Sequence, residues 1–287
     1  MHPISCYYIN LARSALRRQH MEQQFEQLGV NAIRVEAVDG KTLASADIPP
    51  LSTRAKEKWH MTMPEIACLL SHRKVWRMIC ASHHEYSIVL EDDVKLSTDI
   101  GQFLNSDAWI PKNVACIKID TSEVTALHAN FRTISPEGFR LSRPVSDLHS
   151  TAGYLISRQR AERLLSETRT VTAPVDRQMF SVEDPDFLGL DYRQLHPAVC
   201  TQSSHAVVSG FLPKAAAKTT IPRAEPVRPA AKIRMPFGWN KIKRELLRPF
   251  RRLAAKLRIL GRFVYSRLWQ RAVIVPVHFS ENPRLGE

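Results

Sequence analysis

Three consecutive carboxylates, Glu91, Asp92 and Asp93, follow the apolar run SIVL at residues 87–90. The run suits a buried strand, so the acids stand where that strand ends. Neighbouring strand side chains point to opposite faces, so Glu91 and Asp93 share one side while Asp92 faces the other. Two converging carboxylates attract a hard cation such as Mg²⁺ or Mn²⁺, which keeps open positions for phosphate oxygens. A solvated acidic turn is the alternative, and the preceding strand favours the metal site.

A second polar group follows the first apolar run of the chain. Asn10, Arg13, Arg17 and Arg18 stand in the segment INLARSALRR. Because Arg17 comes four residues after Arg13, the two guanidinium groups can face one way on a helix and bind an anion. An exposed basic helix face is the alternative, and surface charge explains Arg17 and Arg18 equally well.

Strands and helices alternate along the chain and would position these side chains. β-Branched and aromatic runs indicate strands, and apolar residues at three- and four-residue steps indicate helices. The predicted strands are residues 4–10, 31–40, 87–90, 114–120 and 151–157, and the predicted helices are 13–29, 63–82 and 158–167. This order predicts an α/β fold with a mostly parallel sheet, in which ligands bind beyond the carboxyl ends of the strands.

Two further polar residues, Ser71 and His72, interrupt the apolar pattern of the helix at 63–82. They can line a site at the end of the sheet. The alternative is structural, since a lone histidine in an apolar helix is more often a hydrogen-bonded core residue than a ligand.

The charge of the chain is divided unevenly. Residues 1–213 hold 23 Lys and Arg against 24 Asp and Glu, whereas residues 214–287 hold 18 against 4, so the last quarter carries the whole basic excess. We therefore predict a catalytic domain at 1–213, a linker rich in proline and alanine at 214–239, and a basic amphipathic helical tail at 240–287.

Three roles are open for this tail. Aromatic residues among its cations favour an anionic membrane surface. A solubilising tail without a partner is the second possibility. Nonspecific binding of nucleic acid is the third, and no base-reading module accompanies it, so we expect no specific nucleic acid partner.

The cysteines and the hydropathy of the chain indicate its cellular location. Cys6, Cys68, Cys80, Cys116 and Cys200 are odd in number and form no CxxC pair, which favours reduced thiols. The N-terminus does not resemble a signal peptide, and no apolar window is long enough for a spanning helix. We expect a cytoplasmic protein, peripheral at the cytoplasmic face of the inner membrane.

Taken together in one order, these segments resemble glycosyltransferase family 25, the lipooligosaccharide (LPS) biosynthesis family related to the collagen galactosyltransferases. The resemblance spans about residues 4–210 and departs from the family at Ala67, where a glycine is typical. Its motifs are INLxRSxxRR, AVDGKTL, MPEIACLLSHRKVW, IVLEDDV, STAGYLISRQRAERLL, PVDRQM and the run PAVCTQ at 197–202.

The resemblance implies a GT-A-like, Rossmann-type fold and transfer of a hexose, most often galactose, from a UDP-sugar with inversion. The acceptor would be an LPS core, a lipid-linked saccharide or a related glycan. Glu91, Asp92 and Asp93 would hold Mn²⁺ or Mg²⁺ against the diphosphate. Asn10, Arg13, Asp39, Ser71 and His72 are candidates for the nucleotide-sugar side of the site.

An inverting transferase needs a base that takes the proton of the acceptor hydroxyl. Asp176, in the segment APVDRQM, is the first candidate, and Asp120, which ends the run VACIKID, is the second. Residues 121–150 are irregular in pattern and are expected to supply acceptor-binding loops. A metal-dependent phosphohydrolase or nuclease, and a noncatalytic module that binds membrane or glycan, are the alternative functions.

Overall fold

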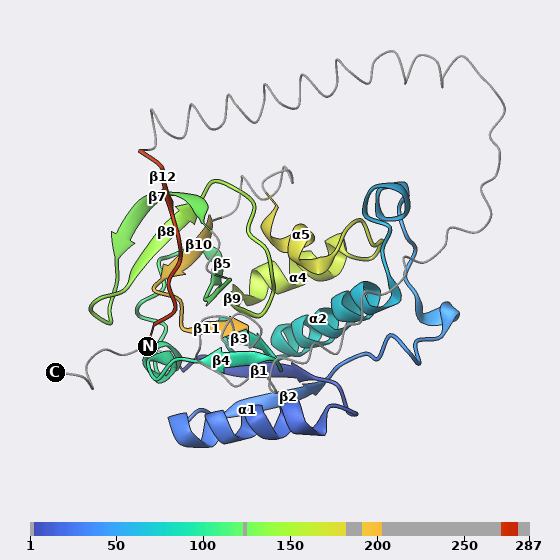
Figure 1. Ribbon diagram of the computed structural model, residues 1–287, viewed down its shortest axis with the longest axis horizontal. Helices are drawn as coiled ribbons and strands as arrows, with labels where there is room; N and C mark the ends of the chain where they lie inside the picture. The colour runs from blue at the N-terminus through green and yellow to red at the C-terminus, as the bar shows by residue number, and fades with distance from the viewer. Residues whose placement is uncertain (1–2, 123–124, 182–190, 203–270, 281–287) are drawn as a thin grey trace, which may run out of the picture.

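The computed structural model describes residues 3–122, 125–181, 191–202 and 271–280, which form an α/β unit (Figure 1). These residues contain one sheet of nine strands and one of three. The strands are β1 Ser5–Asn10, β2 Ala32–Glu36, β3 Tyr86–Glu91, β4 Val94–Leu96, β5 Val114–Lys118, β6 Asp120–Thr121, β7 Ala126–Thr133, β8 Arg140–Pro144, β9 Gly153–Ser157, β10 Asp191–His196, β11 Cys200–Gln202 and β12 Val273–Val275. The helices are α1 Ala15–Leu28, α2 Met63–Ala81, α3 Ile100–Leu104, α4 Arg158–Glu167 and α5 Val175–Phe180, with short turns of other helix types at Ser45–Asp47 and Ala55–Trp59.

The large sheet is mixed. Its order is β12-β7-β8-β10-β5-β9-β3-β1-β2, and the small sheet is β4-β11-β6. In the large sheet β1 pairs in parallel with β2 and β3, and β5 pairs in parallel with β10. The other neighbours are antiparallel, including β9 on both of its sides. The α/β class is therefore confirmed, but the expected mostly parallel sheet is mixed: within the large sheet, parallel pairing is confined to these three pairs.

Local sequence signals explain the first helices. Helix α1 ends at Gly29, whose φ of 63° lies in the left-handed region that glycine adopts without strain. Helix α2 begins with a capping box, in which the Thr62 side chain accepts from the Glu65 N–H and the Glu65 carboxylate accepts from the Thr62 N–H. These caps define where α2 starts, next to the carboxyl end of β3.

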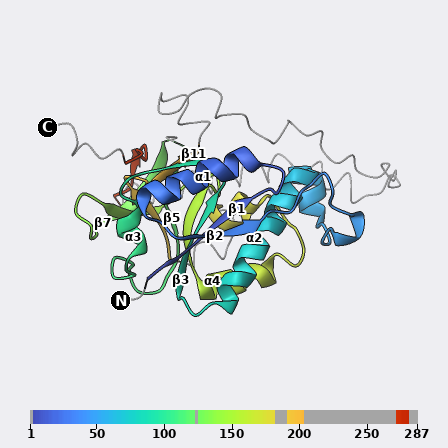
Figure 2. The same cartoon turned by 90° about the horizontal axis from the view of Figure 1, so that it is seen from below.

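Helices cover both faces of the sheet. Alternate residues of β1 face opposite ways, since Tyr8 packs with Phe25 of α1, whereas Tyr7 packs in the cluster that contains Trp76 of α2. Helix α3 belongs to the first of these clusters and α4 and α5 to the second. Figure 2 shows α1 on one side of β1 and β2, and α2 with α4 on the other.

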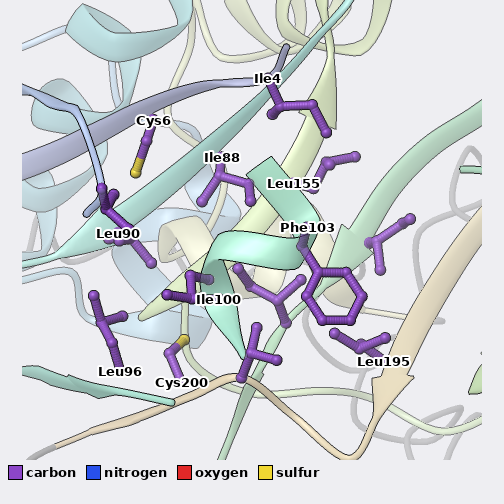
Figure 3. Close-up of a cluster of buried hydrophobic side chains, with 14 of the residues drawn as sticks. Ile4, Cys6, Ile88, Leu90, Leu96, Ile100, Phe103, Leu155, Leu195 and Cys200 are labelled. Atoms are coloured by element: carbon purple, nitrogen blue, oxygen red, sulfur yellow. The ribbon is translucent and has the colours of Figure 1, made fainter. Parts of the chain in front are cut away.

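The cluster on the α1 and α3 face joins the large sheet to the small one. In Figure 3, Leu90 of β3 and Cys200 of β11 lie in the same group of buried side chains as Ile100 of α3. A Cβ atom added to Gly153 of β9 would lie 2.2 Å from the Cys200 sulfur, so only glycine fits there. This close approach holds β11, and Gln202 at its end, against the carboxyl end of β3.

Two expectations are corrected by the structure. Residues 121–150 are not simply loops, because they contain β7 and β8, which pair with each other as antiparallel strands joined by a short connection. The predicted tail at 240–287 is not all helical, because β12 pairs with β7. The β-branched run VIV explains this strand. The linker at 214–239 and residues 240–270 lie outside the described residues.

Candidate active site

The acidic motif opens into a cavity at one edge of the sheet. Strands β1, β2 and β3 run parallel, so their carboxyl ends meet there. The cavity has a volume of about 260 Å³, and its charged lining includes Arg13, Arg17, Asp39, Glu91, Asp92 and Asp93. Residues from the first 40 positions and from the acidic motif therefore share one site.

Asp92 is buried and held from two sides. The Asn10 Nδ2 group donates to Asp92 Oδ2 at 2.7 Å, and Arg17 Nη1 donates to Asp92 Oδ1 at 2.9 Å. Asn10 is fixed in turn by Arg34, whose Nε donates to the Asn10 Oδ1 at 3.0 Å. Asn10 is 1% exposed and is not among the residues that line the cavity, so its contact is with Asp92.

The Asp93 carboxylate has fewer stabilising contacts than the Asp92 carboxylate. Its Oδ2 lies 3.4 Å from Arg17 Nη1, and its buried Oδ1 has no hydrogen-bond partner among the described residues. Burial raises the pKa of Asp93 to about 7, and the negative charges of Glu91 and Asp92 add to this rise, which Arg17 offsets only in part. A buried carboxylate oxygen without a hydrogen-bond partner is suited to bind a cation.

Glu91 has more partners. The Thr151 hydroxyl donates to Glu91 Oε1 at 2.7 Å, and the Nε2 atom of His72 lies 3.5 Å from the same oxygen. Burial acts to raise the pKa of Glu91, but the contacts with His72 and Thr151 and the charge of Lys118 together lower it. Glu91 is therefore held as a carboxylate at the cavity wall.

His72 is positioned by a buried hydrogen-bonded pair. Its Nδ1 lies 2.8 Å from the Tyr154 hydroxyl, which also accepts a hydrogen bond of 3.0 Å from Trp76 Nε1. His72 is 1% exposed, and its Nε2 has no hydrogen-bond partner among the described residues. The imidazole is thus fixed with one nitrogen towards Glu91.

The mouth of the cavity carries an exposed ion pair and a buried hydroxyl. Arg13 Nε lies 2.5 Å from Asp39 Oδ2, and the pKa of Asp39 is lowered by this contact and by the Lys41 N–H. Ser71 donates to the Ala67 carbonyl at 2.7 Å and accepts from the Val38 N–H at 2.9 Å. Ser71 thereby ties the loop after β2 to α2.

A second cavity, of about 470 Å³, adjoins the first. Both are lined by Pro64, Cys68, Glu91 and Gln202, so these residues form the boundary between them. Asp176, in the first turn of α5, lines the second cavity. The carboxylates Glu91 and Asp176 therefore face one continuous space.

Asp120 is placed differently. It is 1% exposed, forms a buried ion pair with Lys118, and accepts from Ser150 Oγ at 3.0 Å. It is not among the residues that line either cavity. Its side chain contacts Ser150, which does line the second cavity.

Comparison with known proteins gives the family. The sequence pattern described as "Glycosyltransferase family 25 (LPS biosynthesis protein)" matches residues 4–179. The chain belongs to glycosyltransferase family 25. The matched residues contain the acidic motif, Arg13, Arg17 and Asp176, and they include all residues that line the two cavities except Gln202.

Relatives of this family 25 glycosyltransferase include the lacto-N-neotetraose biosynthesis glycosyltransferases LgtB of Neisseria gonorrhoeae and of Neisseria meningitidis serogroup B. They are 27% and 29% identical, over 69% of this chain and 74% and 75% of theirs. A glycosyltransferase 25 family member of Drosophila melanogaster is 35% identical over 96 residues, which are 31% of this chain and 16% of that protein.

A crystal structure of a glycosyltransferase involved in the glycosylation of the major capsid of PBCV-1 is also similar. It aligns at a TM-score of 0.41 and 11% identity, over 70% of this chain and 93% of that one. Within the described part of this family 25 chain, none of the helices combines the length and apolar character needed to cross a bilayer.

Most of the site residues predicted from the sequence line one of the two cavities. Arg13, Asp39, Ser71 and His72 line the first cavity with the three acids, and Asp176 lines the second. The sequence patterns did not place Arg17 in the site, although the four-residue spacing from Arg13 was a signal. Thr151 and Gln202 were also missed; both fall inside motifs that resemble the family, STAGYLIS and PAVCTQ.

Proposed function

We propose that this glycosyltransferase moves a hexose, galactose, from a UDP-sugar to an LPS core, a lipid-linked saccharide or a related glycan, with inversion and with a divalent metal. Family membership favours this reaction over the alternatives of a phosphohydrolase or nuclease and of a noncatalytic module. The relatives named for lacto-N-neotetraose biosynthesis support an oligosaccharide acceptor. The adjoining cavities support a donor and an acceptor site that meet at Glu91.

The unpartnered Oδ1 atom of Asp93 is the observation that carries the metal assignment. Asp93 and Glu91 offer hard oxygen ligands on one wall, which fits Mn²⁺ or Mg²⁺. Asp92 completes the proposed metal set; its buried oxygens accept from Asn10 and Arg17, so its main effect is to hold that guanidinium beside the motif. A bound cation would supply positive charge to the diphosphate of the leaving UDP.

The first cavity is the proposed nucleotide-sugar site of a GT-A-like fold. Arg13 and Arg17 place two cations on its wall, where a diphosphate gains from charge-assisted hydrogen bonds. Asp39 at the mouth offers acceptor oxygens to sugar hydroxyls, and its bond to Arg13 keeps it ionised. Ser71 positions the Val38 backbone beside Asp39, so its role is to shape this wall.

The second cavity is the proposed acceptor site, with Asp176 as the base. A base must lie on the acceptor side of the reacting carbon and reach the attacking hydroxyl. Asp176 lines that cavity, whereas Asp120 is engaged by Lys118 and lines neither. We therefore assign proton removal to Asp176 and a structural role to Asp120.

The basic tail predicted at 240–287 is proposed to bind an anionic membrane surface, at the cytoplasmic face of the inner membrane. Its excess of Lys and Arg is the support, together with the gain to an enzyme whose acceptor is carried by a lipid. Sedimentation with anionic vesicles tests this: binding that is lost in neutral vesicles and at high salt is expected, and equal partition to both vesicles would contradict it.

The transfer reaction is tested with a panel of UDP-sugars and oligosaccharide acceptors, with the product's anomeric configuration read by NMR. UDP-galactose, whose sugar is α-linked, is expected to give a β-linked product. An α-linked product would contradict inversion, and preference for another sugar would contradict the donor assignment.

A further inference from the structure

A cluster of a thiol, an imidazole and a carboxylate lies where the two cavities meet. Cys68 and His72 are four residues apart on α2 and face the same way, towards Glu91 at the end of β3. The possible ligand atoms of Cys68, His72 and Glu91 all lie within 4.8 Å of one another. The described residues contain no other cluster of three such groups.

The distances match the needs of a tetrahedral metal. Two ligand atoms of a tetrahedral zinc ion are separated by about 3.5 Å when the bonds are about 2.0–2.3 Å long. The His72 Nε2 to Glu91 Oε1 distance is already 3.5 Å. The Cys68 sulfur lies within 4.8 Å of both of these atoms.

His72 supplies the second, independent observation. Its side chain is 1% exposed, and Nε2 points into the cluster with no hydrogen-bond partner among the described residues. Its other nitrogen contacts the Tyr154 hydroxyl at 2.8 Å. Outer contacts of this kind commonly orient a metal-binding histidine, with Nδ1–H as the donor and Nε2 free for the metal.

We propose that Cys68, His72 and Glu91 form a site for a thiophilic divalent cation of the zinc class, which shares Glu91 with the hard-cation site centred on Asp93. The thiolate and imidazole favour such a cation over Mg²⁺ or Mn²⁺. Three protein ligands leave a fourth position open to water or ligand. On binding, the Cys68 thiol gives its proton to solvent, and His72 keeps its proton on Nδ1.

The site is accessible and shares a ligand with the acidic motif. Cys68 and Glu91 line both cavities, so a cation can enter from either. Because Glu91 belongs to both sets of ligands, zinc held there draws this carboxylate away from the hard cation. Zinc is therefore expected to weaken Mn²⁺ binding and not to take the place of Mn²⁺ in the transfer reaction.

The test uses the full chain and the metals alone. Titration with Co²⁺ is expected to give a thiolate-to-cobalt charge-transfer band in wild type, absent in Cys68→Ser. The control Cys80→Ser, a half-buried thiol on the same helix, should keep the band. Zn²⁺ affinity, measured by calorimetry, should fall at least about 10–100-fold in Cys68→Ser and His72→Gln, and should persist in Asp93→Asn.

Protection of the native thiol provides a second measurement that does not depend on the variants folding. Zn²⁺ should slow alkylation of Cys68 in wild type, as read by mass spectrometry of the peptide that contains it. The proposal is overturned if wild type shows no charge-transfer band and no protection of Cys68, or if both ligand variants bind Zn²⁺ as wild type does. In that outcome His72 only positions Glu91.

Discussion

The Nη1 atom of Arg17 lies 2.9 Å from Oδ1 of Asp92, so the first helix of the chain supplies a guanidinium group to the acidic motif. The same nitrogen lies 3.4 Å from Asp93 Oδ2. One guanidinium therefore contacts two neighbouring carboxylates, whereas Glu91 is contacted separately by the Thr151 hydroxyl and the His72 imidazole. The cavity wall retains an excess of negative charge that favours a bound cation.

Arg17→Gln is expected to destabilise the metal-free protein by about 1–3 kcal/mol, because it leaves Asp92 buried without its charged partner. Arg18→Gln is the matched control, since Arg18 pairs with Glu22 on the exposed surface of the same helix and should change stability by less than about 1 kcal/mol. Urea unfolding measures both. Equal effects of the two changes would argue against a special role for Arg17.

Asp93 should make stability depend on pH. Its pKa rises from 3.8 to about 7 in the folded protein, so between these values the folded state holds a proton that the unfolded state has lost. Stability contributed by that proton is present at low pH and is lost as the pH rises towards 7. The unfolding free energy of metal-free wild type should fall over this range relative to Asp93→Asn. Parallel pH profiles for the two proteins would contradict the shifted pKa.

Asp176→Asn and Asp120→Asn should separate a catalytic carboxylate from a structural one. Asp176→Asn is expected to lower kcat about 100-fold or more with little change in unfolding free energy, because it lines the second cavity. Asp120→Asn should instead destabilise the fold by about 3–5 kcal/mol, because it leaves Lys118 buried without its partner. Steady-state kinetics and urea unfolding distinguish them, and the reverse pattern would exchange the two roles.

Thr151→Val tests the support of Glu91. It removes the 2.7 Å hydrogen bond to Glu91 Oε1 while keeping the side-chain shape, so metal affinity and kcat should fall about tenfold or more. Thr133→Val, at an exposed position of β7, is the control and should leave both unchanged. Retained Mn²⁺ affinity in Thr151→Val, measured by calorimetry, would mean that Glu91 does not need this bond.

Local patterns predicted the N-terminal half of the fold and the strand that ends at Glu91, because each apolar run there matches a strand or helix period. Helical spacing could not show that Arg17 faces the acidic motif, since that depends on how α1 packs across β1 and β3. The pairing of β12 with β7 joins Val273 to His128, and contacts so distant in sequence leave no local signal. Asp120 is buried and Asp176 lines a cavity, and this difference likewise depends on tertiary packing that local sequence patterns do not reveal.

The metal site is tested by UDP release from UDP-galactose, measured with and without Mn²⁺ in wild type and Asp93→Asn. We expect release that requires Mn²⁺ in wild type and is lost in Asp93→Asn, while the variant remains folded. Release that is independent of metal, or unchanged in Asp93→Asn, would contradict the assignment of the acidic motif as the metal site of this glycosyltransferase.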